Sequence, residues 1–205
     1  MEFLKKTLIS FCILVSIQSF AQDSKALQYA FSKSYSFETK YQYDDAIKVI
    51  KELYNEKSYP INMRLGWLYY LSKNYTTSVS YYQKAITIMP ASAEALWALL
   101  SPQIAQEKWS DVEKTYLAIV KLEPKSSTAH YKLGMIYYYR KNYSTAKKYF
   151  DVALNLYPMD YNILLMSGWN NYFLGNVNEA KVLFNRVLII SPGDTSAVEG
   201  LSLIK

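Results

Sequence analysis

Four prolines recur at one fixed interval, and this period restricts the possible folds more than any other feature. Pro90, Pro124, Pro158 and Pro192 lie 34 residues apart each time. A period of roughly 20–50 residues is the signature of repeat proteins, in which each unit buries its apolar face by stacking on its neighbours. The sequence therefore predicts one short stacked array, for which its 205 residues give enough room.

Further columns agree when the sequence is aligned on these prolines. Eight positions before each proline the residue is aromatic: Tyr82, Tyr116, Phe150 and Phe184. Twelve positions before it the residues are mostly small: Ser78, Val112, Ala146 and Ala180. Twenty-four positions before it glycine recurs with one exception: Gly66, Leu100, Gly134 and Gly168. Because several columns recur in fixed phase, the period describes a structural unit.

This order of glycine, aromatic, small residue, second aromatic and closing proline resembles the tetratricopeptide repeat. It is clearest in LGWLYYLSKNYTTSVSYYQKAITIMP and in LGMIYYYRKNYSTAKKYFDVALNLYP. The resemblance implies an all-α fold, a right-handed α-solenoid of stacked antiparallel helix pairs whose first helices line a concave face. The expected segments are a degenerate N-terminal helical repeat at 22–58, repeats at 59–92, 93–126, 127–160 and 161–194, and a truncated C-terminal capping helix at 195–205.

The repeat at 127–160 shows why these residue types recur. Gly134 and Ala146 are small, so the two helices of the pair can approach closely, and Tyr137 and Phe150 are expected to fill the space around that contact. Pro158 disfavours helical geometry at the residue before it and so ends the second helix. Asparagines stand where each second helix begins and are predicted to cap it: Asn74, Asn142 and Asn176.

The repeat at 93–126 departs most from the pattern. Leu100 replaces the glycine, Gln103 stands where two other repeats have tyrosine, and Pro102 lies inside the expected first helix. Proline in a helix interior removes a backbone hydrogen bond and costs about 3 kcal/mol. We therefore expect a kink at this point.

On each first helix, the residues expected to pack against the second helix form a buried stripe, and a second stripe rich in aromatic residues, the aromatic stripe, lies beside it. In the repeat at 127–160 it follows the i, i+4, i+7 spacing of one helix face. Over the four repeats this candidate groove comprises Met63, Trp67, Tyr70, Trp97, Tyr131, Met135, Tyr138, Leu165, Trp169 and Tyr172. Large exposed apolar patches mark interaction sites, so the stripe predicts a groove that binds a protein or peptide segment.

Two alternatives to a peptide groove remain open. The rings can serve only to seal contacts between adjacent first helices, or they can stack on sugar rings, as in a carbohydrate or peptidoglycan binder. Some tetratricopeptide repeats hold a terminal carboxylate with Lys and Asn on the groove helices. Met63 and Trp67 occupy the corresponding first pair here, so the sequence does not support that clamp.

The sequence contains no recognisable catalytic or cofactor site. His130 is the only histidine and falls on a stripe expected to be packed. Asp44 and Asp45 precede a helix, where negative charge stabilises the helix start. Glycine-rich phosphate loops and nucleophile elbows are absent from the sequence. We therefore expect a protein that is not an enzyme and that needs no metal or cofactor.

The first 21 residues differ from the rest. Lys5 and Lys6 precede an apolar run, and Ser19 and Ala21 occupy the small-residue positions of a signal-peptidase site. The segment 1–21 is therefore predicted to be a cleaved signal peptide, with an uncleaved membrane anchor as the alternative. Cys12 is the only cysteine and would be removed. The expected location is periplasmic or secreted, with a bacterial envelope favoured and no transmembrane span after processing.

The chain carries a formal net charge of +6. The basic excess is spread along the sequence, with one local group at 140–148, and no nucleic-acid motif accompanies it. A solvated helix face explains this distribution, so nucleic acid is not an expected partner.

Overall fold

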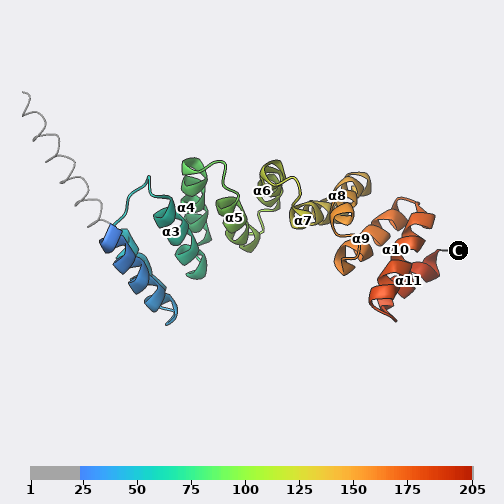
Figure 1. Cartoon of the computed structure of the whole chain (residues 1–205), viewed down its shortest axis with the longest axis horizontal. Coiled ribbons are helices and arrows are strands. Elements are labelled where there is room, and N and C mark those ends of the chain that lie inside the picture. Colours follow the sequence, from blue (N-terminus) through green and yellow to red (C-terminus); the bar gives the residue numbers. More distant parts are fainter. Residues whose placement is uncertain (1–23, 205) are drawn as a thin grey trace, which may run out of the picture. The chain divides into compact units, whose positions relative to one another are not determined.

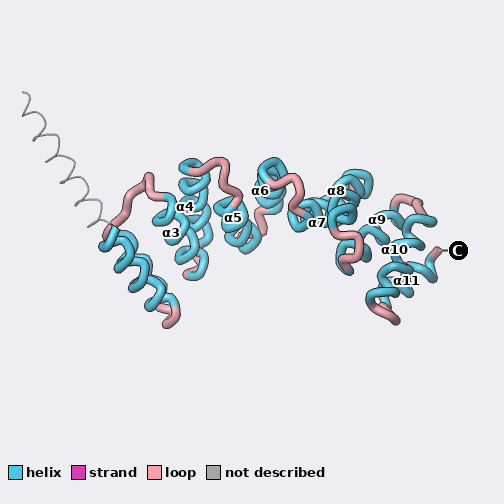
Figure 2. Tube along the Cα trace, viewed as in Figure 1, coloured by secondary structure: helices cyan, strands magenta, loops and turns pink. Residues whose placement is uncertain are grey.

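A computed structural model describes residues 24–204 of the chain. Within this range the chain consists of helices joined by short turns and loops, with no strand (Figure 2). The prediction of an all-α fold is therefore confirmed. The chain divides into two compact units, residues 1–90 and 91–205.

Within each unit the helices follow one another in chain order (Figure 1). The first unit contains a helix at 24–38 and then α2 (Tyr43–Lys51), α3 (Tyr59–Leu71) and α4 (Tyr75–Ile88). The second unit contains α5 (Glu94–Ala105), α6 (Trp109–Leu122), α7 (Ser127–Tyr139), α8 (Tyr143–Leu156), α9 (Tyr161–Phe173), α10 (Val177–Ile190) and α11 (Thr195–Leu203). Within each unit a helix packs on the next one along the chain, which is the packing of an α-solenoid.

The recurring prolines end the second helix of each pair, as predicted. The residue before each proline has a φ near −130° and a ψ near 75°, well outside helical geometry. These residues are Met89, Glu123, Tyr157 and Ser191. The steric effect of proline on the preceding residue therefore ends each second helix at the same point of the period.

Two of the three predicted asparagine caps are present. The side chain of Asn74 accepts a hydrogen bond from the backbone N–H of Thr77, and that of Asn142 accepts one from Thr145. The prediction for Asn176 is wrong, because its side chain makes no capping bond. Its amide instead donates to Oδ1 of the buried Asn171 in α9 at 3.1 Å, and this bond takes the place of a bond to the backbone N–H groups at the start of α10.

The glycine column is where each first helix meets the aromatic ring of its partner helix. A Cβ atom on Gly134 would lie 2.6 Å from the ring of Phe150, and one on Gly66 would lie 2.7 Å from that of Tyr82. Both distances are below any real carbon contact. Ser78 adds a hydrogen bond from its hydroxyl to the carbonyl oxygen of Gly66 at 2.7 Å. The close approach predicted from the small residues is confirmed.

The divergent pair α5 and α6 keeps the helical architecture with different contacts. Pro102 is buried inside α5, and the helix nevertheless continues to Ala105. In place of a tyrosine, Gln103 accepts a hydrogen bond from the hydroxyl of Thr115 at 2.9 Å, and both side chains are buried. A polar pair thus replaces an aromatic one at the contact between these helices.

Candidate functional site

Every residue of the aromatic stripe retains some exposure to solvent. Met63, Trp67 and Tyr70 lie on α3 in the first unit, and the others lie on α5, α7 and α9 in the second. Their neighbours on the same helices, such as Leu65, Leu133 and Leu164, are fully buried. The stripe therefore borders the core, and its role as a binding site stays a prediction.

In the first unit the stripe is tied to the N-terminal helix at 24–38. Trp67 is 39% exposed, and its indole N–H donates to Oε1 of Glu38 at 2.8 Å. Glu38 also forms an ion pair with the buried Arg64, whose guanidinium lies 4.0 Å from the ring centroid of Tyr35. Nε of Arg64 donates to the hydroxyl of Ser34 at 3.0 Å. Trp67 is thus oriented by a polar network while part of its ring remains exposed.

The two stripe tryptophans of the second unit are held in the same way. The indole N–H of Trp97 donates to Oε2 of Glu123, and that of Trp169 donates to the hydroxyl of Ser196, each at 2.9 Å. Trp169 also packs edge-on against the buried ring of Phe184. The N–H edge of each of these indoles is used in contacts within the fold. The part of the ring that stays exposed is the part that a ligand could contact, so packing and recognition concern different parts of the same side chain.

Three stripe residues of α7 and α9, Tyr138, Trp169 and Tyr172, belong to a larger group of rings. This α7–α9 aromatic cluster is held together by centroid distances of 5.0–6.2 Å and comprises Tyr138, Tyr139, Tyr143, Trp169, Tyr172 and Phe173. Tyr143 stacks on Phe173 at 5.0 Å with 11° between the ring planes. Tyr139 is 73% exposed and Phe173 47% exposed. The cluster therefore presents a continuous aromatic surface within one unit.

Sequence reasoning assigned only half of this cluster. The predicted stripe contains Tyr138, Trp169 and Tyr172 but leaves out Tyr139, Tyr143 and Phe173. Both Phe173 and Tyr139 are the last residues of their first helices, 34 residues apart. An aromatic residue at this repeated position was the signal that could have identified them.

Tyr138 lies at the centre of the cluster and contacts Tyr139, Tyr143 and Phe173. Burial among these rings raises the pKa of its hydroxyl to about 12, with a smaller contribution from Tyr143. The side chain stays partly exposed, so it contributes to packing as well as to the surface.

Tyr137 has different partners from Tyr138. Its ring stacks on Tyr149 of α8, and its hydroxyl donates to the carboxylate of Glu113 in α6. Arg140 forms an ion pair with the same carboxylate. Burial alone would raise the pKa of Glu113, but the hydrogen bonds from Tyr137 and Arg140 outweigh it and lower that pKa. The ring of Tyr137 is therefore half-buried at the edge of the contact between α7 and α8, less enclosed than the ring of Phe150.

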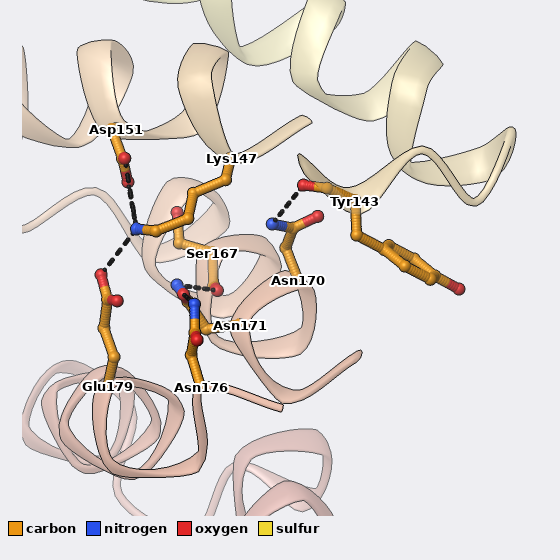
Figure 3. A network of polar contacts seen from close by, with 8 residues as sticks. All are labelled: Tyr143, Lys147, Asp151, Ser167, Asn170, Asn171, Asn176 and Glu179. Carbon is orange, nitrogen blue, oxygen red and sulfur yellow. Dashed lines mark hydrogen bonds and ion pairs between the residues drawn. The ribbon is translucent and has the colours of Figure 1, made fainter. Parts of the chain in front are cut away.

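Polar contacts join α8, α9 and α10 next to Tyr143 (Figure 3). The buried amide of Asn170 donates to the backbone carbonyl oxygen of Tyr143 at 3.1 Å. Lys147 bridges Oδ1 of Asp151 at 3.0 Å and Oε1 of Glu179 at 2.9 Å. The Asn170 contact ties the first residue of α8 to α9, the helix that carries Phe173.

The described residues provide no evidence of catalytic chemistry. Nε2 of His130 lies 3.0 Å from the carbonyl oxygen of Pro124 and so donates to it, and Asp44 and Asp45 lie in the first turn of α2. Residues 24–204 contain no group of three or more His, Cys, Asp or Glu side chains arranged to hold a metal ion. None of the helices described there is both long and apolar enough to cross a membrane. The predicted signal peptide at 1–21 lies outside the described residues.

The architecture defines a class: an α-helical repeat protein built from pairs of helices with a period of 34 residues. The tetratricopeptide repeat profile matches residues 127–160, and a second profile of the same repeat matches residues 59–92. Each match spans one period. The chain therefore contains tetratricopeptide repeats, as the sequence predicted.

Solved structures share this fold at low sequence identity. A tetratricopeptide repeat protein from Parabacteroides merdae aligns with a TM-score of 0.71 at 20% identity, covering 88% of this chain and 72% of that one. MamA from Desulfovibrio magneticus gives 0.66 at 15% identity, covering 83% and 97%. YrrB, described as a TPR protein with an unusual peptide-binding site, gives 0.67 at 14% identity, covering 88% and 97%. A comparison with curated proteins found no match.

Proposed function

We propose that this chain is a non-enzymatic scaffold for protein–protein interaction and that the α7–α9 aromatic cluster binds a protein or peptide segment. Six partly exposed rings in mutual contact carry the proposal. Tyrosine and tryptophan dominate the binding energy of protein interfaces, because they bury a large area with little loss of side-chain entropy. The partner class agrees with the peptide-binding site named for the structurally similar YrrB.

The energetic basis of binding at this cluster is the removal of apolar ring surface from water. Burial contributes about 25 cal/mol per Å² of apolar surface. Tyr139 and Phe173 expose the largest fractions of their rings in the cluster, 73% and 47%. These two residues therefore have the most to gain when a partner covers them, whereas Trp169 is already hydrogen-bonded to Ser196.

A peptide array probed with the chain would test this proposal. We expect binding to a subset of sequences, weakened by more than about 1 kcal/mol in Tyr139→Ala. Tyr157→Ala is the matched control, because Tyr157 is 57% exposed in the same unit and lies outside the cluster. A glycan array run in parallel tests the carbohydrate alternative. If the chain binds glycans but no peptide, and Tyr139→Ala abolishes the glycan binding, the ligand of the cluster is a sugar and the proposal of a protein partner is wrong.

We propose further that the protein acts in the cell envelope after removal of residues 1–21. The basic start, apolar run and small-residue site in the sequence support this location. Intact-mass measurement of the protein from its native host is the test. A mature chain beginning at Gln22 is the expected result, and retention of residues 1–21 would contradict cleavage.

A further inference from the structure

The first unit contains a second group of aromatic residues, which is bordered by lysines. Tyr69 of α3 stacks on Tyr81 of α4 at 5.4 Å with 6° between the planes, and Tyr54 lies edge-on to Tyr81 at 5.9 Å. Nζ of Lys51 lies 5.9 Å from the ring centroid of Tyr69, and Nζ of Lys84 lies 5.1 Å from that of Tyr81. We call these five residues the basic tyrosine cluster.

The second unit contains the same stacked pair with a different neighbour. Tyr137 and Tyr149 are twelve residues apart, as Tyr69 and Tyr81 are, and stack at 5.5 Å with 5° between the planes. There α6, the second helix of the preceding repeat, supplies Glu113. Its carboxylate accepts a hydrogen bond from the hydroxyl of Tyr137 and forms an ion pair with Arg140. The stacked pair of the second unit therefore holds a carboxylate between a phenol and a guanidinium.

In the first unit the preceding second helix supplies a cation to the stacked pair in place of a carboxylate. Lys51 is the last residue of α2, which precedes the pair as α6 precedes Tyr137. A hydrogen bond with Tyr69 raises the pKa of the Lys51 ammonium, and one with Tyr54 raises that of Lys84. Both lysines are therefore charged at neutral pH.

The basic tyrosine cluster has more hydrogen-bond donors than acceptors. Nζ of Lys84 donates to the hydroxyl of Tyr54 at 2.9 Å, which leaves the hydroxyl proton of Tyr54 free to donate. Among residues 24–204 no ion pair involves Lys51 or Lys84. The carboxylate of Glu56 has the smallest effect among the groups that shift the pKa of Lys84. Two ammonium groups and a phenol proton therefore border the stacked pair of the first unit, whereas a carboxylate borders the stacked pair of the second.

This surface is distinct from the aromatic stripe. Trp67 precedes Tyr69 by two residues on α3, and residues two apart point about 200° apart around a helix. Trp67 is hydrogen-bonded to Glu38 of the N-terminal helix, whereas Tyr69 packs on α4. A ligand at the basic tyrosine cluster therefore does not depend on binding at the stripe or at the α7–α9 aromatic cluster.

We propose that the basic tyrosine cluster binds the carboxylate side chains of an acidic protein segment. A carboxylate there would accept hydrogen bonds from an ammonium group and from a phenol, reproducing in trans the contacts that Glu113 makes within the chain. Hydrogen bonds with a charged partner are the strong ones among protein hydrogen bonds. The exposed lysines offer this charge without first breaking an internal ion pair.

Fluorescence anisotropy with the full chain would test the site. The probe is a fluorescein-labelled peptide of alternating glutamate and serine, and its counterpart has glutamine in place of glutamate. We expect the glutamate peptide to bind at least about tenfold more tightly, and Lys51→Met and Lys84→Met each to weaken it about tenfold. Tyr54→Phe, which removes only the hydroxyl, should weaken it by a smaller factor.

Lys48→Met provides the matched control. Lys48 lies in the last turn of the same helix as Lys51, is exposed, and carries the same charge. Equal weakening by Lys48→Met and Lys51→Met would show general attraction to a basic chain and would overturn the site, as would equal affinity for the two peptides. Unchanged helical circular dichroism in all variants shows that the differences do not come from folding. Tyr139→Ala should leave this binding intact, which separates the site from the proposed function.

Discussion

The ring of Tyr137 in α7 stacks on the ring of Tyr149 in α8, with 5.5 Å between their centroids and 5° between their planes. The next residue, Tyr138, turns to Phe173 of α9 at 6.0 Å. Consecutive helix residues point about 100° apart, so adjacent tyrosines reach different neighbours. Tyr139 turns a further step and is 73% exposed. Of the three consecutive tyrosines, Tyr137 packs within the helix pair, Tyr138 contacts the next repeat and Tyr139 lies at the surface.

Replacement of Tyr137 by alanine should destabilise the fold. Tyr137→Ala removes the stacked ring and the hydrogen bond to Glu113, so we expect the free energy of unfolding to fall by about 2 kcal/mol. Tyr137→Phe keeps the stack and should cost about half as much. Urea denaturation measures both values. Tyr157→Ala, at an exposed site outside these contacts, should change stability by no more than about 0.5 kcal/mol. An equal loss in Tyr137→Ala and Tyr157→Ala would contradict the anchoring role.

Any side chain at Gly134 should overpack the contact between α7 and α8. A Cβ there would lie 2.6 Å from the ring of Phe150, so Gly134→Leu should cost about 1–3 kcal/mol or more. Gly134→Ala tests the same contact with a single methyl group. Its cost should be smaller in a Phe150→Leu background, because removal of the ring opens the space. Additive effects of the two substitutions in thermal unfolding would show that Gly134 and Phe150 are not in contact.

Asn142 and Asn176 occupy equivalent positions and should respond differently to aspartate. Asn142→Ala should cost about 1 kcal/mol, and Asn142→Asp should restore the cap, because a carboxylate also accepts from the backbone N–H of Thr145. Asn176 donates its amide to Oδ1 of Asn171. Asn176→Asp has no such donor and should cost about 1–3 kcal/mol, comparable to Asn176→Ala. Full recovery of stability in Asn176→Asp would instead indicate ordinary capping.

Stability should fall in alkaline solution. The hydrogen bond to Glu113 raises the pKa of Tyr137, and burial raises that of Tyr138, each to about 12. An unfolded tyrosine ionises near pH 10, so between about pH 10 and 12 the unfolded state loses protons that the folded state keeps. This contribution is fully present below about pH 10 and is lost as the pH rises toward 12.

Chemical denaturation at several alkaline pH values checks this expectation. In Tyr138→Phe the fall in the free energy of unfolding between about pH 10 and 12 should be shallower, because one titrating group is absent. Ultraviolet titration should show fewer tyrosines ionising with raised pKa in this variant. The same slope in Tyr138→Phe and the parent chain would contradict the raised pKa of Tyr138.

The sequence alone determined the repeat and the boundaries of its helices. Pro90, Pro124, Pro158 and Pro192 act on the residue directly before them, and Asn142 acts three residues along the chain, so both effects are local and can be predicted without the fold. Gly134 and Phe150 are sixteen residues apart within one helix pair, and their contact follows from the period. The stripe beside the core could likewise be located from helical spacing.

The tertiary structure decided which side chains meet between successive repeats. Nothing local distinguishes Tyr69 from Tyr137, yet Tyr137 donates to Glu113, whereas Tyr69 is bordered by Lys51. The partner of each tyrosine comes from the preceding repeat, where the repeat pattern leaves the residue type unspecified. Within one repeat, the capping bond of Asn176 is replaced by a bond to Asn171, which only the packing of α9 beside α10 reveals. The period specifies the backbone, and the side chains that neighbouring repeats bring into contact then determine the chemistry of each surface.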